Sequence, residues 1–188
     1  ATHLPSMEAA ETHSMSMEFF ATPWYGLFFK HQTKKYEVSH LEGTLNFIPY
    51  GCLVDHFQQV VYEHPEMAPH ERNEAWLKLE KMYRPYLHLE GIPFYERGAG
   101  WQRQNHIFAT PFYYIDYCLA QTVALQFWLE LEKDWKKAWE KYKHFVKRGG
   151  TDTFLGLVEG AGLTSPMEDG CIRQIAEYAS AWLKEKKA

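Results

Sequence analysis

The sequence has few cysteines, no long apolar run and no large basic block, and each shortage excludes a class of protein. Its three cysteines, Cys52, Cys118 and Cys171, are odd in number and widely spaced. This is expected of buried or half-buried thiols in a cytoplasmic protein rather than of a disulfide framework. No stretch reaches the roughly 18 uncharged apolar residues that a membrane helix needs, so we expect no membrane partner.

The charge pattern argues against nucleic acid as a partner. The formal net charge is -4, and the lysines between residues 133 and 147 alternate with Trp and Glu instead of forming a basic block. The first residues, Ala1 to Pro5, contain no basic segment followed by an apolar one, so they do not resemble a signal peptide. A start without Met, close to a helix that looks internal, is expected of a chain trimmed from a longer one.

Strand-like alternation is nearly absent, whereas helical periodicity is frequent. With 46% hydrophobic and 16% aromatic residues, the chain can form a substantial core. We therefore predict an all-α fold, a multi-helix array in which residues 1–188 form a single helical domain, with two small lobes as the alternative.

Proline and glycine set the expected helix limits. Pro23 ends the first helix, Pro49 and Gly51 split a long periodic stretch into a kinked pair, and Thr110-Pro111 begins a later helix. The expected helices span residues 6–21, 24–31, 36–63 as the kinked pair, 71–87, 110–142 with or without a break, 151–159 and 167–187. The spacing of Trp128, Trp135 and Trp139 predicts one buried helical face.

A polar row interrupts the first expected helix. Glu11, Ser14 and Glu18 are three and four residues apart and share one face, while Met15 and Phe19 occupy the neighbouring faces. A carboxylate in apolar surroundings must be paired, hydrogen-bonded or bound to a metal. The alternative is that the row faces water, and the spacing alone does not separate the two.

The residues of this row resemble a known family. Residues 11–20 are similar to the third-ligand helix of the oligoendopeptidase F branch of the thimet-type (M3 family) zinc peptidases. The resemblance covers nearly the whole chain. Its further segments are Ser39-His40-Leu41-Glu42-Gly43, Gly91-Ile92-Pro93-Phe94, Trp101-Gln102-Arg103-Gln104 and, most specifically, His106-Ile107-Phe108-Ala109-Thr110-Pro111-Phe112-Tyr113-Tyr114-Ile115-Asp116-Tyr117.

One motif of that family is missing. None of the ten histidines begins an HExxH: His70-Glu71, for example, is followed by Arg72-Asn73-Glu74. In the family, an earlier helix with this motif supplies two zinc-binding histidines and the catalytic Glu. The chain therefore resembles the C-terminal portion of a longer peptidase, and the missing N-terminal part of the same enzyme is its expected partner.

The resemblance implies a role for both carboxylates of the polar row. Glu11 matches the Glu that completes the zinc site, and Glu18 then accepts a hydrogen bond from a ligand histidine and orients it. Because one carboxylate does not hold Zn²⁺ alone, we expect the isolated chain to bind no catalytic zinc. An ordinary salt bridge is the alternative for Glu18. His13 and His40 are interpreted as packing or hydrogen-bonding residues.

Residues 106–117 carry the expected substrate chemistry. Tyr117 can meet both Tyr113 and Tyr114 on one helical face, and His106 lies in the connection before that helix. The resemblance implies that His106, Tyr114 and Tyr117 hydrogen-bond the oxyanion of the reacting peptide, with Tyr113 beside them in substrate binding. Without the family, a tyrosine-rich core helix is the alternative.

A glycine-bearing loop precedes this segment. Gly98 and Gly100 leave backbone groups accessible, so the loop is interpreted as one wall of the substrate cleft. An ordinary connection between helices is the alternative.

Together these features favour a zinc-dependent metalloendopeptidase that hydrolyses oligopeptides in a deep helical cleft. The family implies one Zn²⁺ per complete site, with two histidine ligands absent from this chain, so the chain alone is expected to be inactive. The alternative is a non-catalytic helical module, derived from such a peptidase, that works through protein contacts. A missing part would expose an apolar face, which makes self-association a further expectation.

Overall fold

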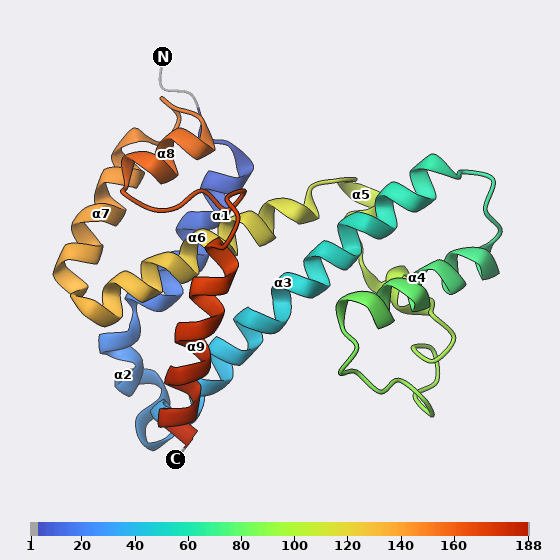
Figure 1. The fold of residues 1–188 in the computed structure, drawn as a ribbon, viewed down its shortest axis with the longest axis horizontal. Helices are drawn as coiled ribbons and strands as arrows, with labels where there is room; N and C mark the ends of the chain where they lie inside the picture. The colour runs from blue at the N-terminus through green and yellow to red at the C-terminus, as the bar shows by residue number, and fades with distance from the viewer. Residues whose placement is uncertain (1–3, 188) are drawn as a thin grey trace. The chain divides into compact units, whose positions relative to one another are not determined.

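Helices form all the regular secondary structure that the structure describes. The computed structural model describes residues 4–187, and no strand occurs in that range. The all-α prediction is confirmed (Figure 1). The helices are α1 (Met7–Phe20), α2 (Tyr25–Phe29), α3 (Thr33–Glu63), α4 (Pro69–Tyr83), α5 (His106–Ala109), α6 (Tyr114–Lys133), α7 (Trp135–Arg148), α8 (Phe154–Gly160) and α9 (Cys171–Lys187), with short 3₁₀ helices η1 (Thr22–Trp24), η2 (Lys30–Gln32) and η3 (Ala99–Arg103). Over the same range, no helix has the length and apolar character needed to cross a bilayer.

The chain divides into two compact units. The first contains the residues up to Thr44 and those from Leu119 onward, and the second runs from Leu45 to Cys118. Both limits fall inside helices, so α3 and α6 each contribute to both units. The sequence predicts one domain, with two lobes as the alternative, and the assignment of both units to one catalytic domain stays a prediction.

Aromatic side chains form the centre of the first unit. Phe20 of α1 is 1% exposed, and its ring centroid lies 5.9 Å from that of Phe127 and 5.0 Å from that of Tyr142. His13, also on α1, packs edge-on against Tyr142 and Phe145. Burial lowers the pKa of His13, which favours the neutral ring. His13 is thus a packing residue, as its sequence position suggests.

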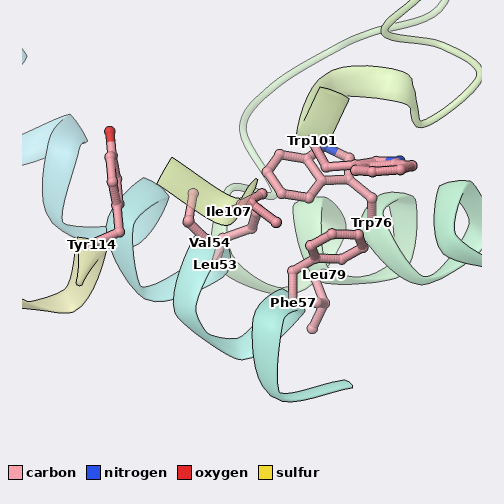
Figure 2. Close-up of a cluster of buried hydrophobic side chains, with 8 residues drawn as sticks. All are labelled: Leu53, Val54, Phe57, Trp76, Leu79, Trp101, Ile107 and Tyr114. Carbon is pink, nitrogen blue, oxygen red and sulfur yellow. The ribbon is translucent and has the colours of Figure 1, made fainter. Parts of the chain in front are cut away.

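A cluster of buried side chains organises the second unit (Figure 2). Trp76 of α4 and Trp101 of η3 both pack on Phe57 of α3, with ring centroids 5.1 and 5.5 Å from it. The remaining members are Leu53, Val54, Leu79, Ile107 and Tyr114. The cluster connects α3, α4, η3, α5 and the start of α6, so it also fixes both ends of the irregular stretch between α4 and η3.

Helix α3 is continuous where the sequence predicts a break. It runs for 31 residues with Pro49 inside it. Proline has no N–H, so one carbonyl of the preceding turn loses its helical partner. Leu41 and Leu53, on either side of the proline, are nevertheless 2% and 0% exposed. Packing on both sides therefore outweighs the helix-breaking tendency of Pro49 and Gly51.

The helix predicted at Thr110-Pro111 begins at Tyr114 instead. Phe112 has a φ of +62°, which an α-helix does not admit. Its N–H donates to the Oε1 atom of Gln58 at 2.8 Å, so a buried side chain of α3 fixes the turn. This long-range hydrogen bond leaves no trace in the local pattern.

The later helix limits also differ from the expected ones. Asp134 is extended and accepts the N–H of Lys137 at 3.2 Å, which separates α6 from α7. Trp128 therefore lies on α6, whereas Trp135 and Trp139 lie on α7, so the three do not share one helical face. The segments predicted at 151–159 and 167–187 begin at Phe154 and Cys171 as α8 and α9.

The three cysteines are thiols, as predicted, with Cys52 half-buried and Cys118 and Cys171 buried. Cys52 and Cys118 are hydrogen-bonded to each other, and this bond lowers the pKa of the Cys52 thiol. Gly51 leaves room for the Cys118 side chain, because a Cβ at position 51 would lie 2.1 Å from the Cys118 sulfur.

Two adjacent residues of α5 test how the cluster holds the second unit. Ile107 is 4% exposed and Phe108 is 58% exposed. We expect Ile107→Ala to lower the free energy of unfolding by about 2–5 kcal/mol through the lost contacts and the cavity left behind. Phe108→Ala, the matched control, is expected to change it by less than about 1 kcal/mol. Urea unfolding followed by tryptophan fluorescence measures both, and equal losses would contradict this packing.

Candidate functional site

The polar row of α1 lies on the open side of that helix in the first unit. Ala9, Thr12 and Ser16 are fully buried on the opposite side. Glu11 is half-buried and Ser14 is exposed. The Ser14 hydroxyl donates to the backbone oxygen of Glu11 at 2.9 Å and reaches its Oε2 at 3.2 Å. The Glu11 carboxylate is therefore oriented by its own helix and lies at the surface of the described unit.

Glu18 has a histidine partner within the chain. Its Oε2 lies 2.7 Å from the Nε2 of His40, and the side chain of Glu18 is 60% exposed whereas that of His40 is 13% exposed. The His40 ring also stacks on Tyr36, with centroids 5.6 Å apart. This pairing corresponds to the alternative given above for Glu18. The orientation of a ligand histidine by Glu18 stays a prediction.

The structure brings His106 and the three predicted tyrosines together in the second unit. The His106 ring centroid lies 6.1 Å from that of Tyr113, 5.0 Å from that of Tyr114 and 5.7 Å from that of Tyr117. Tyr117 in turn lies 4.9 Å from Tyr113 and 5.4 Å from Tyr114. His106 lies in the connection before α6, as predicted, where it begins the short helix α5. Phe112, with its positive φ, lies in the turn between α5 and the tyrosines of α6.

Burial raises the pKa of two phenols in this region, those of Tyr114 and Tyr50. Tyr114 is 9% exposed, and burial is the main reason why its pKa is raised. The pKa of Tyr50, on the facing turn of α3, is also raised by burial. Both phenols therefore keep their protons throughout the neutral range and remain hydrogen-bond donors.

Gln104 connects the cluster to α3, although no local sequence pattern marks it as a site residue. The Tyr50 hydroxyl donates to the Oε1 of Gln104 at 2.8 Å. The Nε2 of Gln104 lies 2.7 Å from the Nδ1 of His106. The one available signal was its place in the Trp101–Gln104 segment of the family resemblance.

A hollow of about 290 Å³ adjoins Gln104 in the second unit. Its charged residues are Glu80, Arg84 and Arg103. Arg84 donates to both carboxylate oxygens of Glu80, at 3.0 and 2.5 Å, so their charges largely offset each other. The other lining residues are Tyr50, Trp76, Tyr95, Gly100 and Gln104.

The two glycines of the predicted cleft wall are buried against α4. Gly98 has a φ of +74°, and a Cβ there would lie 2.1 Å from the backbone oxygen of Asn73. At Gly100, a Cβ would lie 2.7 Å from the indole nitrogen of Trp76. Both positions need glycine for packing. Gly100 also lines the hollow, whereas contact of either residue with a substrate stays a prediction.

The comparisons with known proteins identify the family. The model of peptidase family M3 matches residues 2–177. The chain belongs to peptidase family M3. Among functionally curated proteins, none matched the sequence.

Three solved structures named as peptidases resemble the chain closely. A structure of PZ peptidase A with an inhibitor is 47% identical and covers 97% of this chain, with a TM-score of 0.93. A protein provisionally named oligoendopeptidase F is 45% identical over 98% of this chain, also at 0.93. A similarly named protein from Bacillus anthracis str. Ames is 44% identical over 98% of this chain, with a TM-score of 0.82. The chain spans 32%, 33% and 30% of these three proteins, about a third of their length.

Members of the M3 family are generally zinc-dependent. Within residues 4–187, no group of three or more His, Cys, Asp or Glu side chains is arranged to hold an ion. Catalytic zinc commonly takes three protein ligands. Glu11 can supply one carboxylate oxygen to such an ion, and its assignment as a zinc ligand stays a prediction.

Gly98 and Gly91 form a matched pair for testing the packing of η3 against α4. Both have positive φ, +74° and +76°, but a Cβ at Gly91 meets nothing within 4 Å. We expect Gly91→Ala to cost about 1–2 kcal/mol of unfolding free energy for its backbone conformation. Gly98→Ala should cost roughly 1–3 kcal/mol more because it also pushes η3 away from α4. Urea unfolding compares the two, and equal losses would show that the close approach to Asn73 is unimportant.

Proposed function

We propose that this chain contributes one metal ligand and the oxyanion-binding residues to a zinc-dependent endopeptidase acting on oligopeptides. The observation that carries the proposal is the cluster of one imidazole and three phenols, with His106 within 6.1 Å of each tyrosine between ring centroids. Membership of the M3 family and 44–47% identity to structures named as peptidases support it.

The chemistry of peptide hydrolysis explains why such a cluster is useful. Attack of water on the peptide carbonyl produces a tetrahedral intermediate with a negatively charged oxygen. Neutral donors that are already in place stabilise this charge without reorganising. Tyr114 stays protonated because it is buried, and Tyr117 is half-buried beside it. We assign oxyanion binding to His106, Tyr117 and Tyr114, and substrate contact to Tyr113.

The metal site is proposed to be shared with another part of the enzyme. When bound, Zn²⁺ polarises water and the peptide carbonyl. Glu11 is the residue of this chain that we assign as its ligand, and the hydrogen bond from Ser14 to Oε2 supports that assignment by fixing the carboxylate. The remaining ligands are assigned to two histidines of an HExxH helix outside this chain.

A peptide substrate also needs a surface that binds its main chain. The hollow beside Gln104 offers the backbone of Gly100 and the guanidinium group of Arg103. Arg103 lies over the Tyr95 ring at 5.6 Å, which leaves its N–H groups available to carbonyl oxygens. We propose that this hollow receives part of an extended oligopeptide.

Zinc retention tests the shared site. The 188-residue chain is expected to retain less than about 0.1 zinc per molecule after dialysis, because one carboxylate binds the ion weakly. Addition of a separately produced HExxH-containing part should raise retention to about one. Glu11→Gln should lower this value, and Glu8→Gln, one turn earlier, should not. Stoichiometric zinc on the chain alone, measured by mass spectrometry, would refute the shared site.

Reconstituted peptidase activity tests the oxyanion cluster. We expect the mixture of the two parts to cleave an internally quenched oligopeptide in a chelator-sensitive manner. Tyr117→Phe should lower kcat by about 10²–10³-fold through the loss of one donor. Tyr178→Phe, in α9 and outside the cluster, should leave kcat unchanged.

A stable complex of the two parts without cleavage would favour the non-catalytic module instead. Leu27 and Phe28 of α2, each 73% exposed, would then provide an apolar contact surface. The same two residues are where we expect any self-association of the chain.

A further inference from the structure

A chain of contacts leads from the core of the second unit to His106. The Trp76 indole N–H donates to Oε1 of Glu80 at 3.1 Å. Arg84 donates to the same carboxylate, and its guanidinium lies 4.7 Å from the centroid of the Tyr50 ring. Tyr50 is thereby held between α4 and the Gln104 side chain.

Tyr50 sets the orientation of the Gln104 amide. Its hydroxyl donates to Oε1 at 2.8 Å, which places the amide oxygen on the Tyr50 side. The amide nitrogen then faces His106, and this nitrogen is a donor only. The His106 Nδ1 atom, 2.7 Å away, must accept that hydrogen bond.

We propose that Gln104 is a positioning residue that holds neutral His106 in the Nε2–H tautomer. The neutral imidazole carries one proton, and a ring whose Nδ1 accepts a hydrogen bond must carry it on Nε2. The Nε2–H bond is directed away from Gln104 and is available as a donor. The part of this inference that concerns catalysis rests on the proposed function, because there His106 donates to the oxyanion.

The groups around the ring leave Gln104 as the residue that sets the tautomer. The faces and edges of His106 meet the rings of Tyr113, Tyr114 and Tyr117. The nearest charges in the contact chain are Arg84 and Glu80, and they act on Tyr50 and not on the imidazole directly. Gln104 holds the contact at Nδ1.

The test measures the tautomer by nitrogen NMR. The ¹⁵N-labelled 188-residue chain is studied by long-range ¹H–¹⁵N correlation at a pH where His106 is neutral. The expected result is an unprotonated Nδ1 and a protonated Nε2. Tyr50→Phe should release the amide and produce a mixture of the two tautomers. A protonated Nδ1 in the unsubstituted chain would overturn the proposal without further variants.

Gln104→Glu should reverse the direction of the hydrogen bond between residue 104 and the Nδ1 atom of His106. A carboxylate only accepts, so Nδ1 of His106 should become protonated and the pKa of the ring should rise. Gln102→Glu adds the same charge at an exposed position two residues earlier and should leave the tautomer as it was. A folded Gln104→Glu chain with unchanged tautomer and unchanged His106 titration would also overturn the proposal.

Kinetics of the reconstituted enzyme separate this inference from the proposed function. At a pH where the His106 ring of the variant is neutral, Gln104→Glu should lower kcat by about a hundredfold, with KM within a factor of about three, because the proton on Nδ1 leaves Nε2 without the hydrogen that it would donate to the oxyanion. It should also shift the pH profile of kcat, which a purely structural loss would not do. An Nε2–H tautomer together with a reconstituted complex that cleaves nothing would refute the peptidase and leave the tautomer assignment standing. Cleavage together with an Nδ1–H tautomer would refute the tautomer assignment and leave the proposed peptidase function standing.

Discussion

One buried carboxylate, that of Glu80, sets the constraint on which the candidate site depends. The residue is 4% exposed, and a charge removed from water is costly unless it is fully hydrogen-bonded. Trp76 and Arg84 supply those bonds. Satisfying Glu80 thus fixes the Trp76 indole in the core and the Arg84 guanidinium over Tyr50. Because Tyr50 then orients Gln104, the charge in the core is linked to the catalytic imidazole proposed at the surface.

The same core explains why the loop around Gly98 has its sequence. Trp76 lies against Gly100, and the chain of α4 lies against Gly98 so closely that a Cβ at either glycine would collide. These glycines bring η3 against α4, and η3 ends one residue before Gln104. Small residues here therefore permit close packing, and the position of Gln104 follows from that packing. A role in binding substrate backbone would be additional to this one.

Local patterns predicted the fold class and part of the site, for reasons that can be traced to particular residues. Helical spacing brings Tyr117 to both Tyr113 and Tyr114, as the centroid distances of 4.9 and 5.4 Å show. The approach of His106 depends instead on the Phe112 turn, which a hydrogen bond from 54 residues away fixes. The continuity of α3 through Pro49 and the role of Gln104 likewise arise from tertiary contacts, so local sequence rules do not contain them.

On our proposal, the carboxylates of α1 belong to a metal site that this chain shares with another part of the enzyme. Glu18 is paired with His40, whereas Glu11 is oriented by the Ser14 hydroxyl and is half-buried. A ligand that is fixed by its own helix loses little conformational entropy when a cation arrives, which is an advantage only if the other ligands are equally fixed. Since the chain spans about a third of its solved relatives, those ligands belong, on our proposal, to the remaining part. Metal affinity would then depend on how firmly that part is joined to this one.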